Sequence, residues 1–442
     1  MRDTIKKIIS NQGFQKYLKN TSWLFGERIL RMSVGLVVSL WVARYLGPTR
    51  FGVLSYAQSF AALFTVFSTL GLDGIVVREL IANESKRDVL MGTSFLLKLG
   101  GAFFVILLLT VAVSFSSNDK ITNVLIIIVG SASIFQSLNV IDFYFQSKVL
   151  SKFVVYANVI TFFVSSVIKV ILILKKAPLI AFGIVILVDS ILVALGCLFF
   201  YLKNNLSVKK WRFDKYLAIS LIKDSWPLIL GGFMVSVYMK IDQVMIKEML
   251  DPNAVGQYAA AANLNEYWNF INVIIISSLF PAILNAKKIS EELYYKRLQR
   301  LYDLVVWIAI MIALPLTLFS GRIVHLLYGA AFSAAGDVLK IYVWSGVFVF
   351  LGVASGKWIL SENLTMLSFW RTFIGAVVNI ILNIVLIPLY GINGAANATL
   401  ISYFISGFLF DAFHKKMRRT FIMKLQTINI FRLKLTNKGV GR

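Results

Sequence analysis

Long hydrophobic runs alternate with short polar or basic segments along the whole chain. Each run reaches about 20 residues, enough for an α-helix to cross the ~30 Å hydrocarbon core of a bilayer. Backbone groups in hydrocarbon must be paired within their own segment, so we expect helices; a membrane β-barrel would show short alternating segments instead. The pattern predicts twelve spans, over residues 23–45, 53–77, 89–115, 122–146, 153–174, 178–202, 226–249, 256–284, 300–320, 337–360, 366–389 and 393–413.

Composition excludes an ordinary soluble domain. Hydrophobic residues make up 58% of the 442 residues, and the mean hydropathy is +0.78. A chain of this composition has more apolar surface than a soluble fold can bury. The net charge of +24 would suggest nucleic acid in a soluble protein. Here the basic residues gather in loops and tails, so we expect a bilayer and no nucleic acid as partner. With the N-terminus in the cytoplasm, and with Arg44 and Arg300 at span ends counted with the adjoining loops, inside segments hold 30 Lys and Arg and outside loops hold six, which predicts that both termini are cytoplasmic.

The longest basic loop separates two halves of six spans. The expected organisation is a cytoplasmic segment over 1–22, a six-helix bundle over 23–202, a cytoplasmic loop over 203–224, a second six-helix bundle over 225–414 and a basic cytoplasmic tail over 415–442. A short motif recurs after the first span of each half at a constant offset of 204; its members are Leu46, Pro48 and Gly52, then Leu250, Pro252 and Gly256. An even number of spans gives the two repeats the same orientation in the membrane, with a cleft between the bundles.

Charged and amide side chains interrupt the apolar runs, and such residues usually face a hydrated cavity. The cationic candidates are Arg28, Arg31, Lys98, Lys169, Lys240 and Arg371, and the candidates for ion coupling or pairing are Glu27, Asp142 and Asp242. Polar stripes at helical spacing comprise Asn158, Thr161, Ser165 and Lys169 on one span, Asn265, Asn269 and Asn272 on another, and Asn139, Asp142 and Gln146 on a third.

Each of these features has a structural alternative. Arg28, Lys169 and Arg371 lie near span ends, where long side chains reach the interface. Amide stripes also join helices to one another. Glu27 and Arg31 are four residues apart and can pair, and for Asp142 and Asp242 we favour pairing with basic neighbours over a coupling role.

Catalytic signatures are sparse. The two histidines, His325 and His414, lie far apart in the sequence, there is one cysteine, and no phosphate-binding GxxxxGK[ST] loop occurs. The longest loop is about 22 residues, without room for a soluble catalytic domain. We therefore expect a transporter rather than an enzyme, without a cofactor.

Three segments carry a family resemblance: ARYLGPTRFG at 43–52, GLDGIVVREL at 71–80 and IPLYGINGAANATLISY at 387–403. With the length and the six-plus-six division, the chain resembles the Wzx-type polysaccharide flippases of the multidrug/oligosaccharidyl-lipid/polysaccharide (MOP) exporter superfamily. The resemblance implies an all-α polytopic membrane protein of about twelve helices in two six-helix bundles, a MATE-like fold.

The resemblance also implies a function. Such proteins move oligosaccharide units linked to undecaprenyl pyrophosphate from the cytoplasmic to the periplasmic leaflet of the inner membrane by alternating access, for O-antigen or capsule biosynthesis. A polysaccharide polymerase and a chain-length regulator are the candidate protein partners. Arg28 and Arg31 match first-span arginines that hold pyrophosphate in related lipid flippases, and Lys98, Lys240 and Arg371 are expected to assist them. Sugar recognition is expected from Asn158, Lys169, Asn265, Asn269 and Asn272.

Two other function classes stay open at this point. One is a cation-coupled antiporter of the multidrug type, which would favour an acidic lumen. The other is a membrane polysaccharide polymerase. The excess of cationic over anionic candidates within the spans favours the flippase over the antiporter.

Overall fold

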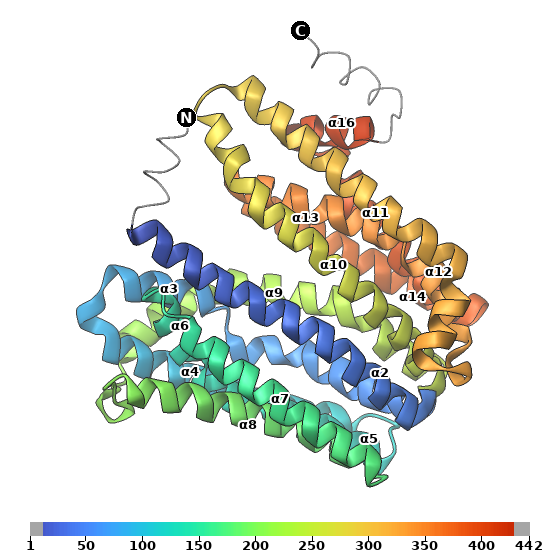
Figure 1. The fold of residues 1–442 in the computed structure, drawn as a ribbon, viewed down its shortest axis with the longest axis horizontal. Helices are drawn as coiled ribbons and strands as arrows, with labels where there is room; N and C mark the ends of the chain where they lie inside the picture. Colours follow the sequence, from blue (N-terminus) through green and yellow to red (C-terminus); the bar gives the residue numbers. More distant parts are fainter. Residues whose placement is uncertain (1–11, 428–442) are drawn as a thin grey trace. The chain divides into compact units, whose positions relative to one another are not determined.

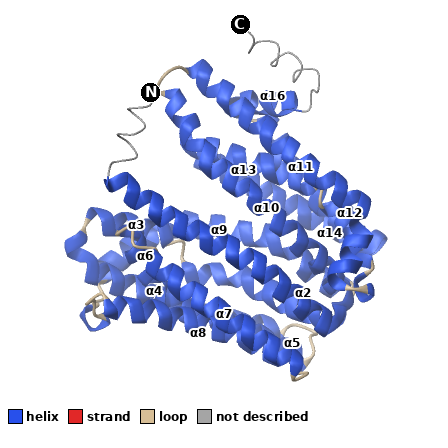
Figure 2. Cartoon of the chain, viewed as in Figure 1, coloured by secondary structure: helices blue, strands red, loops and turns tan. Residues whose placement is uncertain are grey.

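The computed structural model describes residues 12–427, which form helices and loops with no strand among them (Figure 2). These helices build two compact units: of the described residues, unit 1 comprises 12–46 and 53–236, and unit 2 comprises 47–52 and 237–427. In chain order up to the division between the units, the elements are α2 (Gln12–Thr69), α3 (Asp73–Ala82), η1 (Glu84–Lys86), α4 (Arg87–Ser114), α5 (Lys120–Gln136), η2 (Ser137–Asn139), α6 (Val140–Ser147), α7 (Lys152–Leu174), α8 (Leu179–Lys203), η3 (Val208–Lys210) and α9 (Lys215–Met249).

The remaining elements belong to unit 2 (Figure 1). They are α10 (Pro252–Lys287), α11 (Glu291–Tyr328), η4 (Ala330–Phe332), α12 (Ala334–Tyr342), α13 (Ser345–Ser361), α14 (Thr365–Phe404), the π-helical turn η5 (Ile405–Leu409), α15 (Phe410–Phe413), η6 (Lys415–Met417) and α16 (Arg418–Thr427).

Ten helical stretches among the described residues are long and apolar enough to cross a membrane. Two of them contain a break at a glycine with positive φ, at Gly47 (φ 68°) in α2 and Gly391 (φ 58°) in α14. Glycine adopts such angles at little cost because it lacks a Cβ. Each break lies between two spans predicted from the sequence, so the expected all-α polytopic fold of about twelve spans is confirmed.

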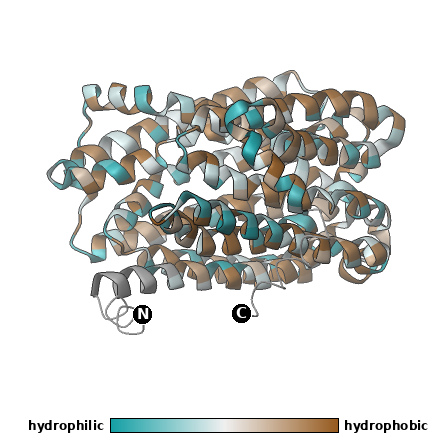
Figure 3. Ribbon diagram, turned by 90° about the horizontal axis from the view of Figure 1, so that it is seen from above, coloured by the Kyte–Doolittle hydropathy of each residue, from teal (hydrophilic) through white to brown (hydrophobic). Residues whose placement is uncertain are grey.

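The helix surfaces suit a hydrocarbon environment. On α4, Phe103, Leu107 and Val111 recur every fourth residue and are 57%, 59% and 47% exposed. A stripe of this kind would be unfavourable in water. Figure 3 shows hydrophobic residues along most of the helices, with hydrophilic residues concentrated in particular turns and ends.

The structure adds detail to two of the predicted segments outside the spans. The loop expected over 203–224 is shorter, because α9 begins at Lys215 after Asp214 accepts a hydrogen bond from the Leu217 amide (2.7 Å) and so caps the helix. The basic tail expected over 415–442 begins with the helical turns η6 and α16, for which the sequence pattern made no prediction. Residues 1–11 of the predicted N-terminal segment and 428–442 of the predicted tail lie outside the described residues.

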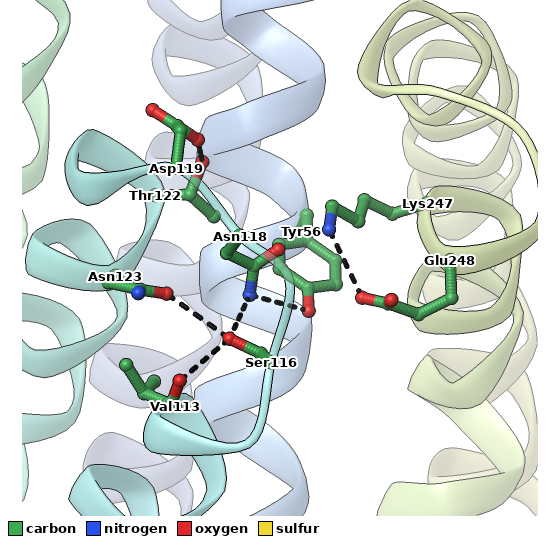
Figure 4. A network of polar contacts seen from close by, with 9 residues as sticks. All are labelled: Tyr56, Val113, Ser116, Asn118, Asp119, Thr122, Asn123, Lys247 and Glu248. Atoms are coloured by element: carbon green, nitrogen blue, oxygen red, sulfur yellow. Dashed lines mark hydrogen bonds and ion pairs between the residues drawn. The ribbon is translucent and has the colours of Figure 1, made fainter.

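Short polar contacts fix the loops of unit 1. Between α4 and α5, Asn118 donates to the Tyr56 hydroxyl (3.3 Å) and to Ser116 Oγ (3.0 Å), and Ser116 donates to the Val113 carbonyl (2.8 Å; Figure 4). Asp119 then caps α5, accepting from the Ile121 amide (3.2 Å). Side chains thus satisfy backbone and amide groups where the chain leaves the helices.

The repeated motif forms a reciprocal contact within unit 2. A Cβ added to Gly52 would lie 1.8 Å from the Pro252 carbonyl oxygen, and a Cβ added to Gly256 would lie 2.0 Å from the Pro48 carbonyl oxygen. Thr49 accepts a hydrogen bond from the Asn253 amide (3.4 Å), across the same 204-residue offset. The two turns therefore pack backbone against backbone, which explains why glycine stands at the last position of each motif.

Replacing Gly52 or Gly256 by alanine is expected to destabilise the protein. The new methyl group would overlap a backbone oxygen, and such overpacking typically costs about 1–3 kcal/mol. The measurement is the thermal unfolding midpoint of the purified protein in detergent. Gly100→Ala is the matched control, because a Cβ there meets nothing within 4 Å; equal midpoints for all three variants and the wild type would contradict the tight contact.

Candidate functional site

Unit 1 contains a polar cavity of about 400 Å³ within its membrane-spanning helices. Arg31 of α2 contributes to it, and α7 and α8, which run side by side (Figure 1), supply most of the other lining residues. The lining residues are Arg31, Gln136, Asn139, Asn158, Thr161, Phe162, Ser165, Lys169, Asp189, Ser190 and Val193. The volume is in the range of small-ligand pockets.

The polar stripe predicted along residues 158–169 lies in this cavity. Asn158, Thr161, Ser165 and Lys169 recur at intervals of three or four residues on α7, so their side chains share one face of the helix. Asn139, from a second predicted stripe, also lines the cavity. Two of the residues assigned to sugar binding, Asn158 and Lys169, are therefore brought together.

The side chain of Arg31 is paired with Glu27, the partner predicted from the sequence. Its Nη1 donates to Glu27 Oε1 at 3.2 Å, one helical turn away, which confirms the i, i+4 pair. The Glu27 side chain is 10% exposed, whereas that of Arg31 is 50% exposed. Since a guanidinium carries five N–H donors, Arg31 keeps donors for a ligand while Glu27 fixes its orientation.

A second ion pair lies at the same cavity. Lys169 Nζ is 3.5 Å from Asp189 Oδ2, between α7 and α8. Asp189 Oδ1 and Ser165 Oγ are buried and have no hydrogen-bond partner in the described part of the chain. Buried polar atoms are normally satisfied, so these two atoms offer hydrogen bonds to a bound ligand. Asp189 was not among the predicted site residues, although an aspartate within the apolar run ILVDSIL was the available signal.

The other predicted cations do not line this cavity. Arg28 is exposed on α2. Lys98 is buried, lies 3.7 Å from Asp73 Oδ1 and contacts the Phe143 ring at 4.7 Å. Lys240 belongs to unit 2 and lies 3.3 Å from Glu266 Oε1. Lys98 and Lys240 thus already have carboxylate partners, and their role in holding an anion stays a prediction.

Arg371 lines a different cavity, of about 330 Å³, inside unit 2. Its guanidinium donates to Ser355 Oγ (2.9 Å) and to the Gly352 carbonyl (3.1 Å). The five cations predicted to hold pyrophosphate therefore do not form one cluster within either unit. Sequence spacing within a helix could not reveal this, because it does not say which helices pack together.

The amide stripe on α10 faces the interior of unit 2. Asn265 and Asn272 are 3% and 0% exposed, and Gly346 of α13 approaches Asn265 and Asn269 closely enough that a Cβ would lie 3.9 Å from each Oδ1. Both side-chain polar atoms of Asn272 lack a partner in the described residues. This close approach of α13 favours a helix-packing role for the stripe, and sugar binding by these residues stays a prediction.

Asp242 is buried in a network of neutral groups. Its carboxylate accepts hydrogen bonds from the Tyr258 hydroxyl (2.7 Å), Thr399 Oγ1 (2.6 Å) and Asn383 Nδ2 (2.7 Å), and is 3% exposed. No Lys or Arg forms an ion pair with it within residues 12–427, so the favoured pairing interpretation is wrong for Asp242. An uncompensated carboxylate in a low-dielectric interior is costly, so this arrangement suits a bound proton or a small cation.

Asn383 and Asn379 were not recognised from the sequence. Asn383 Nδ2 also lies 3.1 Å from Asn379 Oδ1, one turn away, and Asn383 Oδ1 has no partner among the described residues. Two amides at i, i+4 inside the apolar run VVNIILNIV were the available signal. Asp142, for which pairing with a basic neighbour was also favoured, accepts from Gln146 (2.9 Å) within its own helix, and no ion pair to it is found in the described residues.

Comparisons with known proteins connect this arrangement to a family. A family model described as polysaccharide biosynthesis protein matches residues 17–287. The probable low-salt glycan biosynthesis flippase Agl15 of Haloferax volcanii is 24% identical over 200 residues, which cover 44% of this chain and 39% of that protein. The uncharacterized membrane protein MJ1068 of Methanocaldococcus jannaschii is 23% identical over 429 residues, covering 88% of this chain and 82% of that protein.

Two solved structures show the same fold. The lipid II flippase MurJ in an inward closed conformation has a TM-score of 0.69 at 18% identity, with 95% of this chain and 93% of that chain covered. An inward-facing multidrug resistance MATE family transporter of the MOP superfamily also has a TM-score of 0.69, at 12% identity, with 93% and 96% covered. At these identities the likeness establishes the fold.

Proposed function

The chain belongs to the polysaccharide biosynthesis protein family, and from that premise we propose that it is a flippase for lipid-linked oligosaccharides. The proposed substrate is an oligosaccharide repeat unit on undecaprenyl pyrophosphate, moved from the cytoplasmic to the periplasmic leaflet of the inner membrane by alternating access. The product would serve O-antigen or capsule assembly. Both chain termini lie on the cytoplasmic side in this proposal, with a polymerase and a chain-length regulator as partners.

The polar cavity of unit 1 is the observation that carries the proposal. It places Arg31 and Lys169 beside amides and hydroxyls within membrane-spanning helices. Arginine matches phosphate oxygens through paired N–H donors, and amides and hydroxyls match sugar hydroxyl groups. Without such groups, moving a charged pyrophosphate and a glycan through hydrocarbon would be prohibitive. The polyprenyl chain can stay in the lipid.

The same cavity argues against the alternatives. A multidrug antiporter for organic cations calls for a net acidic cavity, whereas these walls carry two basic residues and one acidic residue. A polymerase would need groups that activate a sugar hydroxyl. In this cavity Asp189, whose Oδ2 is paired with Lys169, is the one carboxylate, and no histidine or second carboxylate among the described residues lines the walls to act with it.

Gene deletion in the source cells tests the proposal. We expect loss of surface polysaccharide and accumulation of lipid-linked oligosaccharide inside the cell, both reversed by a plasmid-borne copy. Unchanged surface polysaccharide together with increased sensitivity to cationic drugs would favour the antiporter instead. Shortened glycan chains on the surface, with export intact, would favour the polymerase.

We further propose that Asp242 couples transport to a proton or a small cation. Asp242→Asn keeps the shape but removes the charge, so translocation is expected to fall about tenfold and to lose its dependence on the ion gradient. Transport in vesicles with imposed proton or sodium gradients provides the measurement. Asp303→Asn, at a carboxylate that accepts from Gln299 (2.8 Å), is the matched control. Wild-type gradient dependence in Asp242→Asn would exclude coupling at this residue.

A further inference from the structure

The cavity around Arg371 is built entirely from helices of unit 2. Tyr238 of α9 lies on one side, α13 and α14 form the main walls, and the π-helical turn η5 contributes two residues. The lining residues are Tyr238, Phe348, Val349, Gly352, Val353, Gly356, Lys357, Leu360, Ser368, Arg371, Thr372, Tyr403, Ser406 and Gly407. The proposed glycan cavity of unit 1 shares none of them.

The charge of this cavity is positive. Arg371 and Lys357 line it, and no Asp or Glu does. The Arg371 guanidinium is fixed by neutral acceptors only, Ser355 Oγ and the Gly352 carbonyl, and the described residues show no ion pair to it. Since these contacts use two of its five N–H donors, three stay available for an anion.

Local packing makes room for the guanidinium and for a ligand. A Cβ on Gly356 would lie 3.3 Å from Arg371 Nη2, so the glycine lets the guanidinium lie against α13. Tyr238 and Ser406 share a hydrogen bond (2.7 Å) in the wall. The Gly407 carbonyl accepts from Lys424 (2.6 Å) and is thereby satisfied. Such π-helical turns occur frequently at functional sites.

The rest of the wall is hydrocarbon-like. Phe348, Val349, Val353 and Leu360 line the cavity along α13. Leu360 is 53% exposed and Lys357 is also exposed, so the cavity opens at the surface of unit 2 along a membrane-spanning helix. A small hydrated anion would gain little from these apolar residues and would lose hydration there. An anion attached to a hydrocarbon chain matches both the cationic and the apolar residues of the wall.

We infer that this cavity binds a phosphate-bearing lipid, with the phosphate on Arg371 and Lys357 and the start of the hydrocarbon chain along the apolar side of α13. A bilayer phospholipid and a polyprenyl phosphate share this chemistry. The cavity is separate from the proposed glycan cavity of unit 1. Binding of a polyprenyl phosphate here rests on the proposed flippase function, whereas binding of a bilayer phospholipid does not.

Lipid binding to the purified full-length protein tests the inference. After delipidation in detergent, the probes are phosphatidylglycerol, a polyprenyl phosphate, diacylglycerol with the same acyl chains and inorganic phosphate, each followed by native mass spectrometry. We expect phosphatidylglycerol or polyprenyl phosphate to bind, and the lipid that binds more tightly identifies the source. Arg371→Met is expected to weaken that binding about tenfold or more, as for loss of a charge-assisted contact.

Three further variants separate binding from folding. Lys340→Met removes an exposed cation of α12 that does not line the cavity, and wild-type binding is expected. Arg371→Lys keeps the charge and is expected to retain part of the binding. Gly356→Ala keeps Arg371 but crowds its guanidinium, and severalfold weaker binding is expected with an unchanged melting temperature. Equal lipid binding by Arg371→Met and wild type, or diacylglycerol or free phosphate binding as tightly as the phospholipid, would overturn the inference.

Discussion

Arg31→Ala is expected to reduce translocation about 10- to 100-fold while leaving the amount of folded protein unchanged. Arg31 is the arginine that lines the unit 1 cavity, and a hydrogen bond to a charged partner is worth about 1.5–3 kcal/mol. Its side chain is half exposed and contributes little to the core, so the loss is expected in function and not in folding. Surface polysaccharide per unit of membrane-inserted protein is the measurement.

Controls for Arg31 must separate anion binding from the pair with Glu27. Lys175→Ala removes an exposed cation of the same unit that does not line the cavity, and full activity is expected. Glu27→Gln combined with Arg31→Ala removes the stranded carboxylate, and the activity should stay low. Recovery in that double variant would mean that the unpaired Glu27, and not the missing cation, caused the defect.

Lys424→Met is expected to destabilise unit 2 by about 3–5 kcal/mol, the usual cost of removing one partner of a buried ion pair. Lys424 Nζ lies 2.7 Å from Asp411 Oδ2, and both side chains are 0% exposed. Thr420 also donates to Asp411 (3.0 Å). Burial lowers the pKa of Lys424 to about 8, although Asp411 acts in the opposite direction, so the ammonium is still charged at neutral pH.

The destabilisation should depend on the stranded carboxylate. Combining Lys424→Met with Asp411→Leu replaces the pair by apolar groups and is expected to recover much of the lost stability. Lys415→Met, at an exposed position of the same segment, should behave as wild type. The measurement is the unfolding midpoint in detergent; no difference between Lys424→Met and Lys415→Met would contradict a stabilising buried pair.

The sequence determined the membrane fold because hydrophobic periodicity reports directly on helices in lipid. It also located part of the candidate site, since Asn158, Thr161, Ser165 and Lys169 share a helix face whatever surrounds them. The Glu27–Arg31 pair was predictable for the same reason. These are local relations, set by the geometry of a single helix.

Contacts between side chains of different helices could not be predicted from spacing along a single helix. The groups around Asp242 come from positions 16, 141 and 157 residues away in the chain, which no local spacing reveals. Likewise, nothing in the run SFWRTFIG indicated that Arg371 and Arg31 would line two separate cavities. Charges within apolar runs identified candidates, but the grouping of those candidates depended on tertiary packing.

Translocation by the purified protein is the most direct test of the central claim. The full-length chain is reconstituted into liposomes with a fluorescent polyprenyl-pyrophosphate-linked oligosaccharide, and an impermeant quencher reports the accessible fraction over time. We expect that wild-type protein makes the inner-leaflet substrate accessible and that Arg31→Ala does so at least about tenfold more slowly. If the quencher reaches only the substrate of the outer leaflet, as in protein-free liposomes, the protein does not translocate this substrate and the proposed flippase function is wrong.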